Sequence, residues 1–104
     1  MSSRLDKLKT LVAEDPGNAF LRYGLATEYA NTGDLEQAVV EFRELLATSP
    51  DYAAGYYHGG RALEKLGRPD EAREIYEKGI AVTMRTGDGH TRSELQAALD
   101  MLGL

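Results

Sequence analysis

Apolar side chains recur every three or four residues along most of the chain, which is the spacing of one face of an α-helix. Leu5, Leu8 and Leu11 set this pattern near the start, and Leu95 and Leu99 repeat it near the end. No segment shows the strict alternation of a strand. The pattern predicts an all-α chain of about six helices, at residues 3–14, 19–31, 52–66, 69–84 and 91–102, with one more from Asp34 to the break at Ser49 and Pro50.

Short polar breaks separate these segments and supply helix caps. Asn18 and Asp51 each precede a predicted helix. Their side chains can accept hydrogen bonds from the first free backbone N–H groups of that helix. Asp88 and Thr91 are both candidate caps of the last helix. Thr91 fits better, because Glu94 follows three residues later and completes a capping box.

An interval of 34 residues recurs across the middle of the chain. The segment TGDLEQA at residues 32–38 is followed by LGRPDEA at residues 66–72. The same interval relates helix-breaking, small and aromatic positions, namely Pro16 and Pro50, Ala26 and Gly60, Ala38 and Ala72, Tyr23 and Tyr57, and Phe42 and Tyr76. A repeat of this length predicts a helix–turn–helix solenoid, in which each unit packs on its neighbour.

The composition narrows the classes of function. The 104 residues suit one domain, and 42% hydrophobic with 28% charged residues allow a packed core. The lack of cysteine excludes disulfides and thiolate metal sites, and a net charge of −5 argues against nucleic acid as a partner. No apolar run reaches the roughly 20 residues that span a membrane, and the start MSSRLDKLKT lacks an apolar signal region. We expect a soluble, cytoplasmic protein without a membrane partner.

In the residue types at these repeated positions, the chain resembles the tetratricopeptide repeat (TPR) family. Its size and its last segment, GDGHTRSELQAAL, are similar to small free-standing bacterial members of that family. The resemblance implies a single domain, residues 1–104, with repeats at 19–52 and 53–86. Segments 3–16 and 88–104 would then be capping helices that cover the two ends of the stack.

Several positions depart from the family pattern or specify its packing. Arg22 and Gly59 stand where the family carries bulky apolar residues, and Met84 replaces the terminal proline of the second repeat, so the helix that contains it can continue towards residue 86. Gly60 and Ala72 are paired small positions at which the two helices of one repeat can approach closely. We expect Gly60 to face the region of Ala72.

The two histidines are the candidates for reactive or metal-binding groups. His58 has no carboxylate at helical spacing. His90 lies between Asp88 and Glu94, which leaves a metal cluster open as an alternative to a helix start with capping acids. The segment YHGGRA lies within a predicted helix and lacks the strand that precedes a phosphate-binding loop. We expect no enzymatic activity, no catalytic residue, no cofactor and no metal, with the alternative at His90 left open.

The resemblance assigns the inner, concave surface of the stack to the first helix of each repeat. The matching positions here are Phe20, Tyr23, Thr27 and Asn31, then Ala54, Tyr57, Arg61 and Lys65. Aromatic rings beside an arginine are typical of interface hot spots, so we expect this surface to bind a partner. The alternative is that the tyrosines are half-buried packing residues. The lysine and asparagine with which chaperone-binding members hold a peptide's terminal carboxylate are replaced by Tyr23 and Thr27.

These features predict a protein–protein interaction module that binds a protein or peptide of mixed apolar and charged character. The competing class is a self-associating structural subunit, which would pair through Leu95, Leu99 and Leu102 or through the tyrosine surface. We expect a monomer at micromolar concentration, because the terminal helices cover the stack and a net charge of −5 opposes self-contact.

Overall fold

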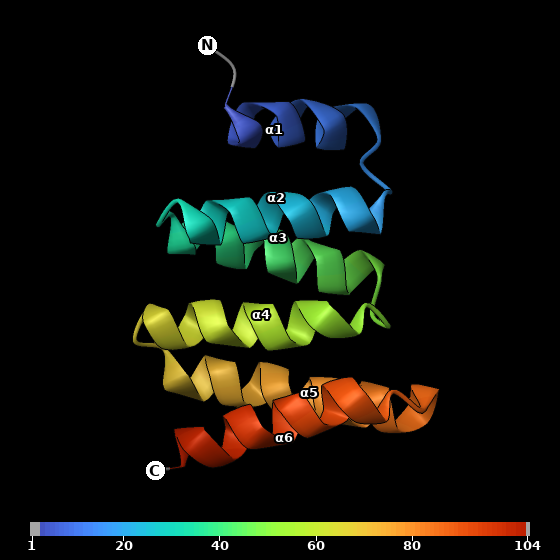
Figure 1. The fold of residues 1–104 in the computed structure, drawn as a ribbon, viewed down its shortest axis with the longest axis vertical. Helices are drawn as coiled ribbons and strands as arrows, with labels where there is room; N and C mark the ends of the chain where they lie inside the picture. The colour runs from blue at the N-terminus through green and yellow to red at the C-terminus, as the bar shows by residue number, and fades with distance from the viewer. Residues whose placement is uncertain (1–2, 104) are drawn as a thin grey trace.

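The computed structural model describes residues 3–103, and every regular element within them is an α-helix (Figure 1). The six helices are α1 (Arg4–Glu14), α2 (Ala19–Asn31), α3 (Leu35–Thr48), α4 (Ala53–Lys65), α5 (Pro69–Thr86) and α6 (Gly89–Leu102). The all-α helical-repeat fold predicted from the sequence is confirmed. Met1, Ser2 and Leu104, which belong to the predicted domain of residues 1–104, lie outside the described residues.

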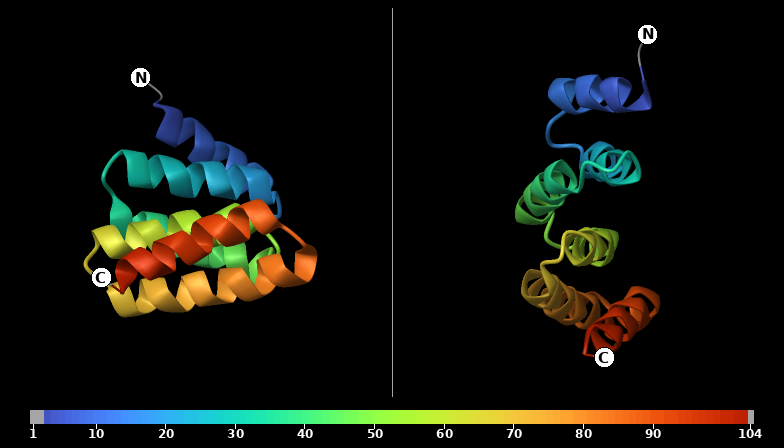
Figure 2. Two further views of the ribbon diagram at one scale, coloured as in Figure 1. Left: turned by 60° about the horizontal axis from the view of Figure 1, so that its bottom comes forward. Right: turned by 90° about the vertical axis from the view of Figure 1, so that its left-hand side faces the viewer.

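The helices form two layers. Seen along their axes, α2, α4 and α6 lie on one side of the stack, and α3 and α5 lie on the other (Figure 2). The central helix α4 contacts both α2 and α6, as well as α3 and α5. We call the side formed by α2, α4 and α6 the inner face, and the side formed by α3 and α5 the outer face.

The repeated glycines mark the turns within the stack. Gly33 and Gly67 have φ angles of +91° and +74°, a left-handed conformation that glycine adopts without the steric cost of a Cβ atom. They close the α2–α3 and α4–α5 turns at equivalent points of the 34-residue register. The spacing seen in the sequence therefore corresponds to a repeated turn geometry.

The predicted cap at Asp51 is wrong, and so is the preference for Thr91 over Asp88. Asp51 does not cap α4; its carboxylate forms an ion pair with Arg85 instead, and α4 begins without a side-chain cap. At the last helix, Asp88 is the cap, since its carboxylate accepts a 3.1 Å hydrogen bond from the Thr91 N–H. That bond places Thr91 inside the first turn, so α6 begins at Gly89 rather than at residue 91.

A close contact between α4 and α5 is centred on Gly60. An ideal Cβ placed on Gly60 would lie 2.2 Å from Cε1 of the Tyr76 ring, so the ring occupies the space that any other side chain would need. Tyr76 lies one turn beyond Ala72 on α5, and both are fully buried. The expected close approach at Gly60 is therefore present, and its contact is Tyr76.

Arg22 is accommodated by an ion pair. Its guanidinium Nη1 lies 2.7 Å from Oε1 of Glu41 on α3, and the two side chains are 15% and 13% exposed. Nη2 also donates to the backbone carbonyl of Pro16 at 3.3 Å. A charged residue thus fills a largely buried position because a carboxylate on the neighbouring helix compensates its charge.

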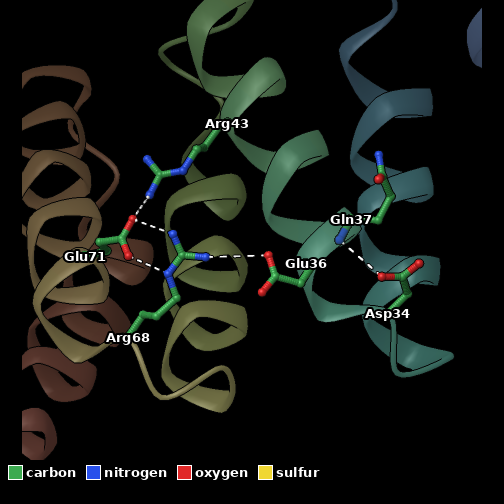
Figure 3. Close-up of polar contacts among 6 residues, drawn as sticks. All are labelled: Asp34, Glu36, Gln37, Arg43, Arg68 and Glu71. Carbon is green, nitrogen blue, oxygen red and sulfur yellow. Dashed lines mark hydrogen bonds and ion pairs between the residues drawn. The ribbon is translucent and has the colours of Figure 1, made fainter.

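A network of charged side chains crosses the outer face (Figure 3). Arg68, at the start of α5, pairs with Glu71 through Nε at 2.5 Å and with Glu36 of α3 at 3.7 Å. Glu71 also accepts a 2.9 Å hydrogen bond from Arg43 of α3. The hydrogen bond from Arg68 lowers the pKa of the Glu71 carboxyl. The network joins α3 to α5 in a solvent-accessible setting, where each pair contributes little to stability.

Candidate partner-binding surface

The seven residues predicted to bind a partner lie on α2 and α4. The four from α2 border one cleft of about 220 Å³, which also includes Leu8 of α1. Two of those from α4 border a second cleft of about 500 Å³. The α2 residues are Phe20, Tyr23, Thr27 and Asn31, and the α4 residues are Tyr57, Arg61 and Lys65.

The ring of Phe20 is the most accessible aromatic group among them. Its residue is 67% exposed, whereas Tyr23 and Tyr57 are half-buried. Arg61 and Lys65 lie one helical turn apart and are exposed. The surface therefore offers one free ring, two partly accessible rings and two cations.

The rings of Tyr23 and Tyr57 are linked through a third ring, that of His58. Both contact His58 edge-on, with centroid distances of 5.8 Å to Tyr23 and 5.1 Å to Tyr57. Tyr23 also lies 5.3 Å from the ring of Tyr52 and 6.4 Å from that of Phe42 in the core. Sequence reasoning missed His58 and Tyr52 as members of this aromatic cluster, although His58 directly follows Tyr57 in the chain.

The surroundings of the two tyrosines differ in kind. Tyr23 packs on the buried Phe42 ring, and burial raises the pKa of its hydroxyl. Tyr57 instead borders the larger cleft beside Arg61. The packing interpretation therefore applies to Tyr23 more strongly than to Tyr57, and an experiment on binding must separate the two positions.

Helix α6 forms one wall of the larger cleft. Its side chains Glu94, Ala97, Ala98 and Met101 face Tyr57, Arg61 and Glu64 of α4 across the cleft. The sequence analysis treated the last helix as a cap and as a possible self-association surface, and did not place it beside a cleft. In the structure it lies on the same side of the stack as α2 and α4, as another inner-face helix.

Comparison with known proteins identifies the fold family. A TPR repeat-containing protein of Pseudomonas aeruginosa is 31% identical over 98 residues, covering 94% of this chain and 93% of that protein. The family model described as "Tetratricopeptide repeat" matches residues 31–85. The chain belongs to the tetratricopeptide repeat family.

Solved structures share the arrangement. A TPR domain protein from Salinibacter ruber, determined by solution NMR, superposes with a TM-score of 0.80 at 40% identity, covering 85% of this chain and 89% of that one. PcrH, crystallised in complex with the chaperone binding region of PopD, superposes with a TM-score of 0.88 at 17% identity, covering 95% and 75%. The likeness to PcrH shows a common fold.

Within the described residues, neither histidine of this TPR chain lies in a metal-binding cluster. His90 lies 3.6 Å from Glu94, while the Asp88 carboxylate accepts the N–H of Thr91 as a helix cap. Across residues 3–103, no three histidine, cysteine or acidic side chains lie close enough together to hold a metal ion. The metal cluster left open at His90 is therefore not formed among these residues: His90 lies near Glu94, and Asp88 serves as the cap of α6. For His58, partial burial lowers the pKa of the imidazole, and Glu94 partly opposes this effect.

Of the helices α1 to α6, none has both the length and the apolar composition that crossing a bilayer requires.

Proposed function

We propose that this TPR chain is a protein-interaction module whose inner face binds an extended segment of a partner protein. The observation that carries the proposal is the larger cleft, where the half-buried ring of Tyr57 and the exposed guanidinium of Arg61 border an opening of about 500 Å³. Aromatic rings and arginine are the residue types that supply most of the energy at protein interfaces. A cytoplasmic location and a bacterial source stay predictions from the sequence.

Two further points support the proposal. The TPR fold is shared with PcrH, which was crystallised with the chaperone binding region of PopD, so a stack of this shape can hold a segment of another protein. Helices α2 and α4 of the inner face are also packed between neighbouring helices, and a surface that is ordered before binding lowers the entropy cost of association.

The self-associating alternative assigned the pairing of two copies to an apolar stripe of Leu95, Leu99 and Leu102, and these side chains are used within the fold. Leu95 is fully buried in the core, and Leu99 and Leu102 are half-buried and pack against it. Among the large apolar side chains of α6 (Gly89–Leu102), Met101 is the exposed one, at 67% exposure. The tyrosine surface is left as the route by which two copies could pair.

We expect the protein to be a monomer at micromolar concentration. The core-facing leucines of α6 are used within the fold, and the net charge of −5 makes two copies repel each other. Sedimentation equilibrium at low and moderate salt is the measurement. A stable dimer at both salt concentrations would favour the self-associating alternative.

The proposed binding surface can be tested with a partner captured by affinity pull-down. Replacing Tyr57 with alanine should weaken that partner's binding by about 2 kcal/mol, while Val40→Ala should leave it unchanged. Val40 is a suitable control because it is 53% exposed on α3, away from the inner face. Isothermal titration of each folded variant gives the affinities.

A second variant separates binding from packing. Tyr23→Ala removes a ring that contacts the core, so we expect it to lower the denaturation midpoint as well as the affinity. If Tyr57→Ala, folded like the wild type, binds with wild-type affinity, the partner binds elsewhere and the proposal is wrong.

A further inference from the structure

A buried side chain of α5 holds one of the residues that border the larger cleft. The ring of Tyr76 on α5 occupies the space left by Gly60 on α4, and its hydroxyl donates a hydrogen bond to Oε2 of Glu64 one turn further along α4. Glu64 is itself one of the residues that border the cleft. Burial raises the pKa of the Tyr76 hydroxyl, and the bond to Glu64 raises it further, so the phenol stays a donor.

Glu64, bound to Tyr76, is not an ion-pair partner of Arg61. Arg61 and Glu64 are three residues apart on α4, a spacing at which opposite charges on a helix commonly pair. They do not pair here, and within residues 3–103 neither Arg61 nor Lys65 takes part in an ion pair. The carboxylate at that spacing from Arg61 is Glu64, which accepts the hydrogen bond from Tyr76 instead.

The remaining walls of the cleft are apolar apart from one acid. Ala97, Ala98 and Met101 of α6 face the Tyr57 ring. The carboxylate of Glu94 lies 3.6 Å from the imidazole of His90, on its own helix. The inner face continues past the cleft to the aromatic cluster in which His58 and Tyr57 of α4 meet Tyr23 of α2, so the surface extends beyond Arg61.

We propose that the cleft between α4 and α6 recognises an acidic side chain next to a large apolar side chain within an extended peptide, and that Tyr76 keeps Arg61 free for this role by holding Glu64. The apolar side chain packs against Tyr57 and Met101, and the carboxylate receives the guanidinium of Arg61. The positive charge of Lys65 lies one turn further along α4 and favours the same partner. This inference rests on the proposed function, because it assumes that peptides bind on the inner face.

The test uses two blocked synthetic peptides that differ by one charge. Acetyl-Gly-Leu-Asp-Gly-amide and its Asp→Asn counterpart are titrated into the uniformly ¹⁵N-labelled protein, and the backbone amide shifts are followed by NMR. We expect the acidic peptide to shift signals of Arg61, Ala97 and Met101 and to bind about five-fold more tightly than the neutral one, the usual scale of a partly exposed ion pair. Arg61→Gln should abolish the difference between the peptides.

Tyr76 is tested as a positioning residue by rescue. In Tyr76→Phe the ring still fills the space at Gly60, but Glu64 is released and can pair with Arg61, so the preference for the acidic peptide should fall to near one-fold. Adding Glu64→Gln to that variant removes the competing carboxylate and should restore the preference. A purely structural role of the Tyr76 hydroxyl would leave the double variant no better than Tyr76→Phe.

The outcomes distinguish the inference from the function on which it rests. If both peptides shift the inner-face signals and bind equally well, the inner face binds peptides and the role given to Arg61 is wrong. If the acidic peptide shifts signals only on α3 and α5, or shifts none, both the inference and the assignment of the inner face are overturned. Loss of preference in Tyr76→Phe without rescue by Glu64→Gln would leave Arg61 as the selective group and overturn the part given to Tyr76.

Discussion

Replacing Glu41 with alanine is expected to destabilise the fold by about 3 kcal/mol, the scale observed when one partner of a largely buried ion pair is removed. In the wild type the Arg22 side chain is 15% exposed, and the variant leaves its guanidinium with the Pro16 carbonyl as the remaining acceptor among residues 3–103. Urea denaturation followed by circular dichroism gives the change in the free energy of unfolding.

Two controls show whether burial of the charge is the cause. Glu36→Ala removes an equivalent carboxylate from the same helix, but that side chain is 76% exposed and pairs with Arg68 at 3.7 Å, so the loss should stay below about 0.5 kcal/mol. Replacing both Arg22 and Glu41 with leucine should recover much of the lost stability, because an apolar pair needs no charge compensation. Equal losses in Glu41→Ala and Glu36→Ala would contradict this account.

The second large effect is expected at Gly60. A Cβ at this position would lie 2.2 Å from Cε1 and 2.6 Å from Cζ of Tyr76, closer than atoms can approach without a shift of the ring. Gly60→Ala should therefore destabilise by about 2 kcal/mol despite the better helix propensity of alanine, and Gly60→Leu by about 3 kcal/mol. The denaturation midpoints of the two variants give the order.

Gly24 offers a matched control within a helix of the same stack. There an added Cβ would meet its nearest neighbour, Cδ2 of Leu8, at 3.4 Å, which is ordinary contact. Gly24→Ala should be neutral or stabilising by up to about 1 kcal/mol, since alanine favours the helix. A loss at Gly24 as large as that at Gly60 would show that glycine is needed for a reason other than the Tyr76 ring.

The sequence was sufficient to predict the helices and the repeat because both depend on spacing within the chain. Gly33 and Gly67 illustrate this, since their interval in the sequence becomes a pair of equivalent left-handed turns. The partner of a side chain on another helix was harder to predict. Nothing in the local pattern says that Asp51 pairs with Arg85 rather than capping α4, because the two residues meet only after the units have packed.

The candidate surface was predicted only in part, because some of its contacts form between helices that are distant in the sequence. The positions on α2 and α4 followed from the resemblance to the TPR family, matched through the 34-residue register, and their role in binding stays a prediction. The contribution of α6 was missed because α5 runs to Thr86 and shifts the last helix out of the 34-residue register. The link between Tyr76 and Glu64 was hidden as well, since it depends on a ring passing through the gap at Gly60.

The contacts of the helices imply a gradient of local opening along the chain. Among the described helices, α1 contacts α2 alone, whereas α4 contacts α2, α3, α5 and α6. In a stack of neighbours, amide hydrogens at a singly supported end exchange with solvent through small local openings, while those at the centre need nearly complete unfolding. The backbone of α4, which carries Tyr57 and Arg61, is therefore the slowest to exchange, and fraying of α1 leaves the cleft between α4 and α6 intact.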